Sequence, residues 1–295
     1  GCREWNTLQE IRVGATVLPG AAPAAGAVAG GAARSASNGR GGYAGTLSDN
    51  VTDLSNVSLA EVPRFSSTFG EFDRVLGGGL VPGSAVLLGG HPGAGKSTLL
   101  LQTACKLAQH KRSLYVTGEE SLSQVAMRAH RLQLPTQGLK MLAETSVETI
   151  LATAEREKPE VLIIDSIQTM HLEDLSSAPG GVSQVRESAA ALTRFAKRTN
   201  TVLLLVGHVT KDGSLAGPKV LEHMIDASLL LEGDGDSRFR TLCGQKNRFG
   251  AVYELGVFAM VELGLKEVKN PSAIFLSRSE EQSSGSLVMV VWEGT

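Results

Sequence analysis

The sequence of 295 residues has few cysteines, few aromatic residues and almost no net charge, and each shortage excludes a class of protein. Its three cysteines, Cys2, Cys105 and Cys243, form no C-x-x-C pair, which excludes a disulfide framework and favours a reducing compartment, so we expect a cytoplasmic protein. Aromatic residues make up only 4%, too few for a surface built mainly of base-stacking platforms. The formal net charge of −2 excludes binding to DNA by bulk charge, although a local basic groove remains compatible with it.

Long apolar runs are also missing, so we expect no membrane-spanning helix, and no secretory leader is visible. The composition is nevertheless 42% hydrophobic and 20% charged, which is enough to bury a sizeable core. Glycine and alanine dominate after residue 13, and ordered patterning begins near Leu54. We therefore expect a short separate piece over 1–13, a flexible linker over 14–53 and one folded domain over 54–295. Because the chain begins without Met and ends in an apolar run, we expect a piece of a longer protein.

Apolar segments without polar alternation recur along the domain, and amphipathic helical patterns separate them. The predicted strands are 85–88, 114–116, 161–164 and 202–206, and the predicted helices are 96–110, 122–132, 147–154 and 183–199. Capping-box patterns begin two of the helices, at Ser121 and at Thr145. This alternation predicts an α/β fold with a mainly parallel central sheet and helices on both faces. Shorter strand-like runs at 228–231, 239–245, 254–260 and 287–292 predict antiparallel strands added at one edge.

A glycine-rich stretch between the first predicted strand and the following helix matches the pattern G-x-x-x-x-G-K-[ST]. Its residues are Gly90, His91, Pro92, Gly93, Ala94, Gly95, Lys96, Ser97 and Thr98. Glycines let consecutive backbone N–H groups face a polyphosphate, and the helix N-terminus adds its dipole. Lys96 would then contact the β- and γ-phosphates, and the Ser97 hydroxyl would bind Mg²⁺. The flanking strand and helix argue against a chance glycine-rich turn.

Acidic residues follow two other predicted strands, at the edge where parallel strands present their carboxyl ends to ligands. Asp165 ends the run 161–164 and has the position of a second Mg²⁺ ligand, although an aspartate there could also cap a turn. Glu119 and Glu120 follow the run 114–116, and one of them could orient or deprotonate the attacking water. Glu119 is the better candidate because it lies nearer the strand end. Both acids could instead favour the start of the next helix.

Several residues beyond this edge are candidates for sensing nucleotide or binding DNA. His208 follows the run 202–206, where it could contact the γ-phosphate or serve only as a structural residue. Lys211 and Lys219 bracket a glycine-containing loop, and Arg186 follows a second loose segment. Flexible basic loops of this kind could hold a DNA backbone or could simply be solvated.

The segment Lys246-Asn-Arg248-Phe-Gly250 ends a strand-like run near the C-terminal third of the domain. Strand side chains alternate, so Lys246 and Arg248 should project from one face and Asn247 from the other. The two cations could form a solvated edge or could be delivered to a phosphate on the next subunit, and the spacing alone leaves both open.

Four stretches together resemble the RadA/Sms family of bacterial DNA-repair ATPases, which are RecA-like P-loop proteins. They are Leu76-Gly-Gly-Gly-Leu-Val-Pro-Gly83, the glycine-rich stretch 90–98, Tyr115-Val-Thr-Gly-Glu-Glu-Ser121 and Lys246-Asn-Arg-Phe-Gly250. The resemblance runs from about Leu54 to Thr295, and the segment around Cys2 resembles the last piece of the family's N-terminal zinc finger. Most of that finger and the family's Lon-protease-like C-terminal domain are missing here. Zn²⁺ is therefore expected only in a longer chain with the complete finger.

The resemblance implies a DNA-stimulated ATPase that forms a ring of six subunits and acts as a helicase or branch-migration motor on recombination intermediates. It implies ATP and Mg²⁺ as substrate and cofactor, single-stranded and branched DNA as partners, and a recombinase as a further partner. It assigns catalysis to Lys96 and Glu119, Mg²⁺ binding to Ser97 and Asp165, and action across a subunit boundary to Lys246 and Arg248.

Two other function classes remain to be weighed against the motor. One is a nucleotide-gated DNA-binding module that loads or remodels a recombinase without unwinding DNA, which an ATP-dependent unwinding assay would distinguish. The other is a small-molecule kinase, which is weakly supported because the sequence has no recognisable basic lid or acceptor pocket.

Overall fold

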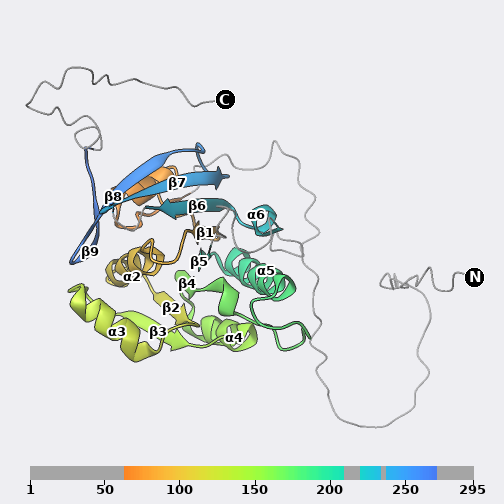
Figure 1. Cartoon of the computed structure of the whole chain (residues 1–295). Coiled ribbons are helices and arrows are strands. Elements are labelled where there is room, and N and C mark those ends of the chain that lie inside the picture. Colours follow the sequence, from red (N-terminus) through yellow and green to blue (C-terminus); the bar gives the residue numbers. More distant parts are fainter. Residues whose placement is uncertain (1–62, 209–219, 234–236, 271–295) are drawn as a thin grey trace, which may run out of the picture. The chain divides into compact units, whose positions relative to one another are not determined.

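A single sheet organises the part of the chain that the computed structural model describes, residues 63–208, 220–233 and 237–270 (Figure 1). All of these residues belong to the second of two units of the chain, Arg40–Thr295. The predicted segments 1–13 and 14–53, the loop lysines Lys211 and Lys219, and the predicted strand 287–292 lie outside the described residues. The predicted domain boundaries therefore stay predictions.

Six parallel strands form the larger part of the sheet, in the order β3-β2-β4-β5-β1-β6. Their bounds are β1 (Ala85–Gly89), β2 (Ser113–Thr117), β3 (Leu139–Ala143), β4 (Val161–Asp165), β5 (Val202–Val206) and β6 (Ala227–Glu232). Every residue of β1, β2, β4 and β5 is buried, as expected for strands covered on both faces. The predicted parallel sheet is confirmed.

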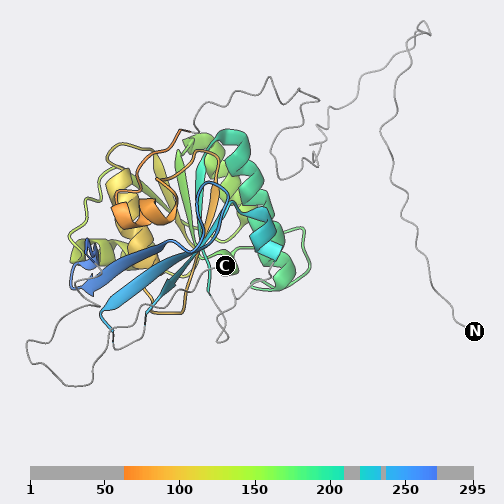
Figure 2. The same ribbon diagram turned by 90° about the horizontal axis from the view of Figure 1, so that it is seen from above.

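Helices cover both faces of this sheet (Figure 2). Alternate strand residues pack against each layer of helices. One layer contains α1 (Gly70–Val75), α2 (Lys96–Leu107) and α3 (Leu122–Arg131), and the other contains α4 (Val147–Glu157), α5 (Val182–Thr199) and α6 (Val220–Met224). On β1, for example, Val86 and Leu88 face the first layer, whereas Leu87 faces the second. No helix in the described part of the chain is long and apolar enough to cross a membrane.

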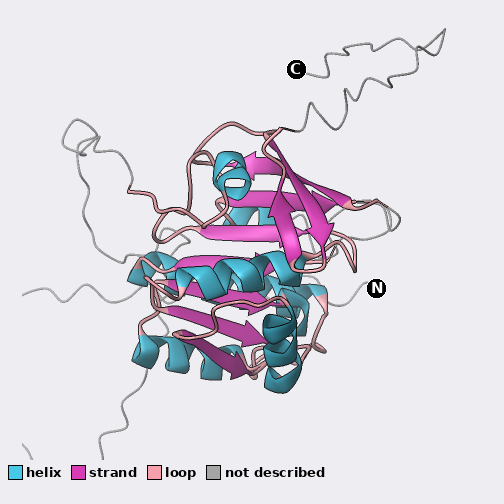
Figure 3. Ribbon diagram, turned by 90° about the vertical axis from the view of Figure 1, so that its left-hand side faces the viewer, coloured by secondary structure: helices cyan, strands magenta, loops and turns pink. Residues whose placement is uncertain are grey.

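Three antiparallel strands extend the sheet beyond β6, as Figure 3 shows. They are β7 (Phe239–Asn247), β8 (Leu255–Val261) and β9 (Gly264–Glu267). The predicted antiparallel edge is confirmed for β7 and β8, but the prediction was wrong for the run 228–231. That run lies in β6, which pairs in parallel with β1 and antiparallel with β7, so it is the strand at which the direction changes.

The two predicted helix starts have different outcomes. Ser121 caps α3 through the predicted capping box with Gln124. At α4 the cap is Ser146 and not Thr145, because the Ser146 hydroxyl accepts a hydrogen bond from the backbone N–H of Thr149. The carboxylate of Glu144 then accepts the N–H groups of Thr145 and Ser146, so it supports the helix start from outside. The predicted box was therefore one residue out of register.

Candidate active site

The glycine-rich stretch forms the turn between β1 and α2, as predicted. Gly95 has φ +104°, a left-handed conformation that a residue with a side chain rarely adopts, and it precedes the first residue of α2. A Cβ at Gly90 would lie 2.4 Å from the carbonyl oxygen of Leu231, so the turn passes against β6 where only glycine fits. The stretch therefore has the backbone of a phosphate-binding loop.

Lys96 is almost completely buried and folds back over this turn. Its Nζ donates hydrogen bonds to the carbonyl oxygens of Gly90 (2.8 Å) and His91 (2.9 Å). Burial lowers the pKa of the Lys96 ammonium, and the carboxylates of Asp165 and Glu119 act in the opposite direction. The ammonium is thus held among carbonyl groups that a phosphate could replace.

Asp165 ends β4 and is buried beside the start of α2. The Tyr115 hydroxyl donates a hydrogen bond to Oδ2 of Asp165 at 2.5 Å, and the Ser97 hydroxyl donates a second hydrogen bond to the same carboxylate. Burial raises the pKa of Asp165, and both hydrogen bonds oppose that shift. The structure therefore brings together the hydroxyl and the carboxylate that the sequence assigns to Mg²⁺.

This pair fits Mg²⁺, because Mg²⁺ prefers hard oxygen ligands and usually keeps only one or two from the protein. The described residues contain no cluster of three or more His, Cys, Asp or Glu that could hold a metal alone. The remaining oxygen ligands would come from phosphates and water. Cys2, the predicted remnant of a zinc site, lies outside the described residues.

The adjacent acids Glu119 and Glu120 point to different partners. Glu120 forms an ion pair with Arg128 of α3. The Glu119 carboxylate accepts a hydrogen bond from the hydroxyl of Ser166, the residue after Asp165. Because Ser121 is the cap and the first turn of α3 contains no acidic residue, neither glutamate serves as the helix cap. The charge of Glu119 acts on both Lys96 and Asp165, whereas the charge of Glu120 acts on Asp165.

His208 lies on the same edge, directly after β5. Its Nε2 is 3.3 Å from Oε1 of Glu119. The structure thus gathers five predicted site residues at the carboxyl ends of the parallel strands, namely Lys96, Ser97, Glu119, Asp165 and His208.

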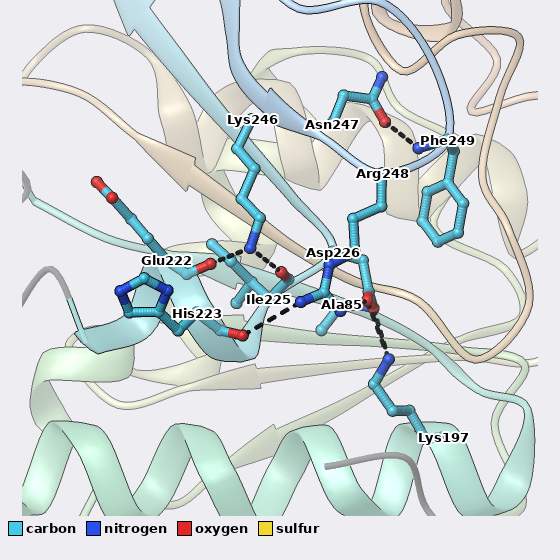
Figure 4. Close-up of polar contacts among 10 residues, drawn as sticks. All are labelled: Ala85, Lys197, Glu222, His223, Ile225, Asp226, Lys246, Asn247, Arg248 and Phe249. Carbon is cyan, nitrogen blue, oxygen red and sulfur yellow. Dashed lines mark hydrogen bonds and ion pairs between the residues drawn. The ribbon is translucent and has the colours of Figure 1, made fainter.

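Lys246 and Arg248 lie at the opposite edge of the sheet, beside the first residue of β6, and Figure 4 shows their contacts. β7 runs antiparallel to β6, so its end at Asn247 pairs with Ala227, the first residue of β6. Lys246 donates to the carbonyl oxygens of Glu222 and Ile225 (2.8 Å for Ile225), at the C-terminal end of α6. The predicted arrangement is confirmed, since both cations point to this segment whereas Asn247 donates to Val75 on the other side.

Arg248 binds Asp226, the residue before β6. Its Nη1 lies 3.1 Å from Oδ1 of Asp226, which also accepts Lys197 of α5. Asp226 is 2% exposed, and its Oδ2 accepts the backbone N–H of Ala85 at the start of β1 (3.0 Å). Burial lowers the pKa of Lys246, and the neighbouring charge of Arg248 lowers it further.

The stretch 76–83 packs against the turn that follows Arg248. Arg64 donates hydrogen bonds to the carbonyl oxygens of Gly77 and Phe249 (2.8 Å for Phe249). A Cβ at Gly250 would lie 2.9 Å from the Cα of Gly77, so the two backbones are in direct contact. Two of the four sequence motifs, residues 76–83 and 246–250, are therefore in direct contact, although they lie far apart in the sequence. We call this contact the joint.

Arg186 does not join either group. It lies near the start of α5, is exposed and pairs with its neighbour Glu187. Sequence reasoning missed Tyr115, Ser166, Lys197 and Asp226, which contact the predicted residues. Tyr115 reads as a core residue of a buried strand, and no spacing signal joins Lys197 to Asp226.

The chain is similar to several known proteins. A model of the AAA domain family matches residues 58–214. The DNA repair protein RadA of Escherichia coli K12 is 64% identical over 296 residues, and the RadA proteins of Haemophilus influenzae Rd and Bacillus subtilis 168 are 61% and 42% identical. Each alignment covers 100% of this chain and 61% of the relative, so the chain spans about three fifths of the length of these proteins.

Solved structures support the fold alone, at 20% sequence identity. A KaiC-like protein from Pyrococcus horikoshii OT3 has a TM-score of 0.58 and covers 70% of this chain and 99% of its own. The RadB recombinase has a TM-score of 0.54 and covers 69% and 99%. These matches confirm the RecA-like α/β fold. The family model spans more than half of the chain and the RadA alignments span all of it, so the chain belongs to the AAA domain family and is a relative of bacterial RadA.

Proposed function

We propose that this chain is the ATP-hydrolysing core of a cytoplasmic DNA-repair motor. In this proposal, single-stranded DNA stimulates its ATP hydrolysis, and a ring of six copies uses the energy to unwind or migrate branched recombination intermediates. The observation that carries the proposal is the convergence of Lys96, the Ser97–Asp165 pair and Glu119 at one edge of the sheet. Open α/β sheets bind their ligands at this edge. The name DNA repair protein, carried by the RadA relatives, supports the role in repair.

The nucleotide chemistry follows from the contacts at this edge. The backbone N–H groups of the turn and the N-terminus of α2 bind the phosphates, and Lys96 exchanges its carbonyl partners for the β- and γ-phosphates. Glu119 orients or deprotonates the attacking water, and His208, next to Glu119, senses the γ-phosphate. Mg²⁺ held by Ser97 and Asp165 would neutralise negative charge on the phosphates.

Lys246 and Arg248 act on the nucleotide of the neighbouring subunit. They lie beside the first residue of β1, whereas the phosphate-binding turn follows its last residue, about 16 Å away at ~3.3 Å per residue. The side chains are too far from their own phosphate site to contact it. In a head-to-tail ring, however, one edge of each subunit faces the opposite edge of the next.

DNA binding is assigned to Arg186, Lys211 and Lys219. Arg186 is exposed at the start of α5, and both lysines belong to the segment between β5 and α6, whose end Lys246 caps. DNA bound by these lysines would therefore be linked through α6 to Lys246, whose ammonium donates to the carbonyl oxygens of Glu222 and Ile225. A recombinase could then load onto the strands that the motor exposes.

The first test measures ATP turnover with and without single-stranded DNA. Lys96→Ala should abolish turnover, because the charge on the β- and γ-phosphates is lost. Stimulation by DNA together with ATP-dependent strand separation supports the motor. Stimulation without strand separation favours the recombinase-loading module, and near-normal turnover in Lys96→Ala would contradict the phosphate site itself.

The second test concerns action between subunits. Arg248→Ala should retain ATP binding and lose turnover by about 10³-fold, the usual effect of removing an arginine finger. Mixing Arg248→Ala with Lys96→Ala subunits should recover activity, because one boundary then has an intact phosphate site and an intact arginine. No recovery at any ratio, in rings shown to be mixed, would contradict action across the boundary.

A further inference from the structure

Two cations share one buried carboxylate at the amino edge of the sheet (Figure 4). Lys197 places its Nζ 3.0 Å from both oxygens of Asp226, and Arg248 places Nη1 3.1 Å from Oδ1. The side chains differ sharply in exposure, at 19% for Lys197, 3% for Asp226 and 51% for Arg248. The carboxylate and Lys197 are thus the inner pair, and Arg248 is the outer partner.

In this arrangement, little free energy is needed to break the ion pair between Arg248 and Asp226. If Arg248 were the sole cation on Asp226, its departure would leave a buried carboxylate unpaired, which disfavours the released state by roughly 100-fold or more. With Lys197 bound to both oxygens, Asp226 stays neutralised. Only a half-exposed ion pair is then lost, and such pairs bias an equilibrium by about fivefold or less.

We infer that Lys197 is a positioning residue for Arg248: it neutralises Asp226 so that the guanidinium can exchange between Asp226 and a phosphate of the neighbouring subunit. The inference rests on the proposed action of Arg248 across the subunit boundary. Asp226 also fixes the start of β1 through Ala85, so it stays in place when Arg248 leaves. In this inference Lys197 is the permanent cation on Asp226, and Arg248 is the exchangeable one.

The test replaces the permanent cation in the assembled protein. Lys197→Met makes Arg248 the remaining side-chain cation on Asp226, so its release should become unfavourable. We expect kcat of the DNA-stimulated ATPase to fall about 10- to 100-fold, with KM for ATP within about threefold of the wild type. Lys197→Arg keeps a permanent cation and should stay within about threefold in kcat.

A second measurement follows Arg248 itself. Phenylglyoxal labels accessible guanidinium groups, and peptide mass spectrometry quantifies the label on Arg248. Lys197→Met should slow this labelling by about threefold or more, which a merely structural role of Lys197 would not do, because local loosening would speed it. Arg198→Met is the matched control, since Arg198 lies in the same last turn of α5 and its contacts, an ion pair with Glu155 and a position over the Phe195 ring, do not involve Asp226.

A double variant keeps the test decisive if Lys197→Met is unstable. Adding Asp226→Asn removes both buried charges and leaves an amide oxygen for the N–H of Ala85, so labelling of Arg248 and turnover should each return to within about threefold of the wild type. The inference is overturned if Arg248 labelling is unchanged or faster in folded Lys197→Met, or if Lys197→Arg loses as much turnover as Lys197→Met. Slowed labelling with unchanged turnover, and no recovery in mixed rings, would instead overturn the action of Arg248 across the boundary.

Discussion

The hydroxyl of Tyr115 on β2 donates a 2.5 Å hydrogen bond to the carboxylate of Asp165 on β4. The register pairs Tyr115 with Ile163, so the ring extends along the neighbouring strand to reach Asp165. Tyr115 is 1% exposed, and its hydroxyl fixes one oxygen of a carboxylate that burial would otherwise leave poorly solvated. The contact orients the carboxylate that we propose as a Mg²⁺ ligand.

Tyr115→Phe should raise the Mg²⁺ concentration for half-maximal ATP turnover by about tenfold. This is the expected effect of losing one hydrogen bond to a charged group, and kcat at saturating Mg²⁺ should change by less than about threefold. A Mg²⁺ titration of the ATPase measures it, with Tyr253→Phe as the control because Tyr253 is 72% exposed. The same Mg²⁺ dependence in both variants would show that the hydroxyl does not orient Asp165.

The two adjacent glutamates provide a matched pair of substitutions. Glu119→Gln should lower turnover by about 10² to 10⁴-fold, the usual contribution of a general base, with ATP binding retained. Glu120→Gln breaks only the ion pair with Arg128 and should cost at most about 1 kcal/mol of stability. Single-turnover hydrolysis and nucleotide binding separate the two, and equal losses of turnover would contradict the assignment of Glu119.

The contact of Gly77 with Gly250 predicts a large effect from one methyl group. Gly250→Ala should destabilise the protein by about 1–3 kcal/mol, because the new Cβ would lie 2.9 Å from the Cα of Gly77 and the backbones must separate. Gly70→Ala is the control, since its Cβ would meet only an oxygen of Glu267 at 3.5 Å, and alanine should stabilise α1 slightly. Urea unfolding measures both, and equal stabilities would refute the close approach.

Glu144 predicts a dependence of stability on pH. The backbone N–H groups of Ser146 and Thr145 lower the pKa of Glu144 in the folded state. Its contribution is therefore complete above the pKa of the unfolded chain, about 4.3, and is lost as the pH falls through the folded value. Glu144→Gln should cost roughly 1 kcal/mol at pH 7 and nothing in acid below the folded pKa. Urea unfolding at the two pH values checks this, with the exposed Glu262→Gln as control. A cost independent of pH would contradict it.

The sequence predicts which residues meet at the carboxyl edge of the sheet, because the carboxyl ends of parallel strands must meet. The sequence predicts individual strands less well where tertiary packing determines whether a strand forms or in which direction it runs. β3 escaped prediction because it is a half-exposed edge strand that includes Lys140. The direction of β6 was missed because this strand pairs in parallel with β1 and antiparallel with β7, and one short apolar run cannot indicate both neighbours.

The finer contacts depend on the tertiary arrangement. Leu122 fits the apolar spacing of α3 and yet is 45% exposed, because Ser121 places it at the very start of the helix, beyond the core. Lys197 and Asp226 are 29 residues apart and meet only because α5 packs beside the start of β6. Helical spacing has no rule for such a pair.

The joint between Gly77 and Gly250 has a mechanical consequence. Because no side chain lies between the two backbones, the turn that contains Arg248 cannot be displaced without moving the segment 76–80. That segment is in turn fixed to Phe65 by the two hydrogen bonds between Phe65 and Leu80. We therefore expect a displacement of the turn to be transmitted through these backbone contacts to the residues around Phe65. A spectroscopic label near Phe65 should therefore report the position of the turn that contains Arg248.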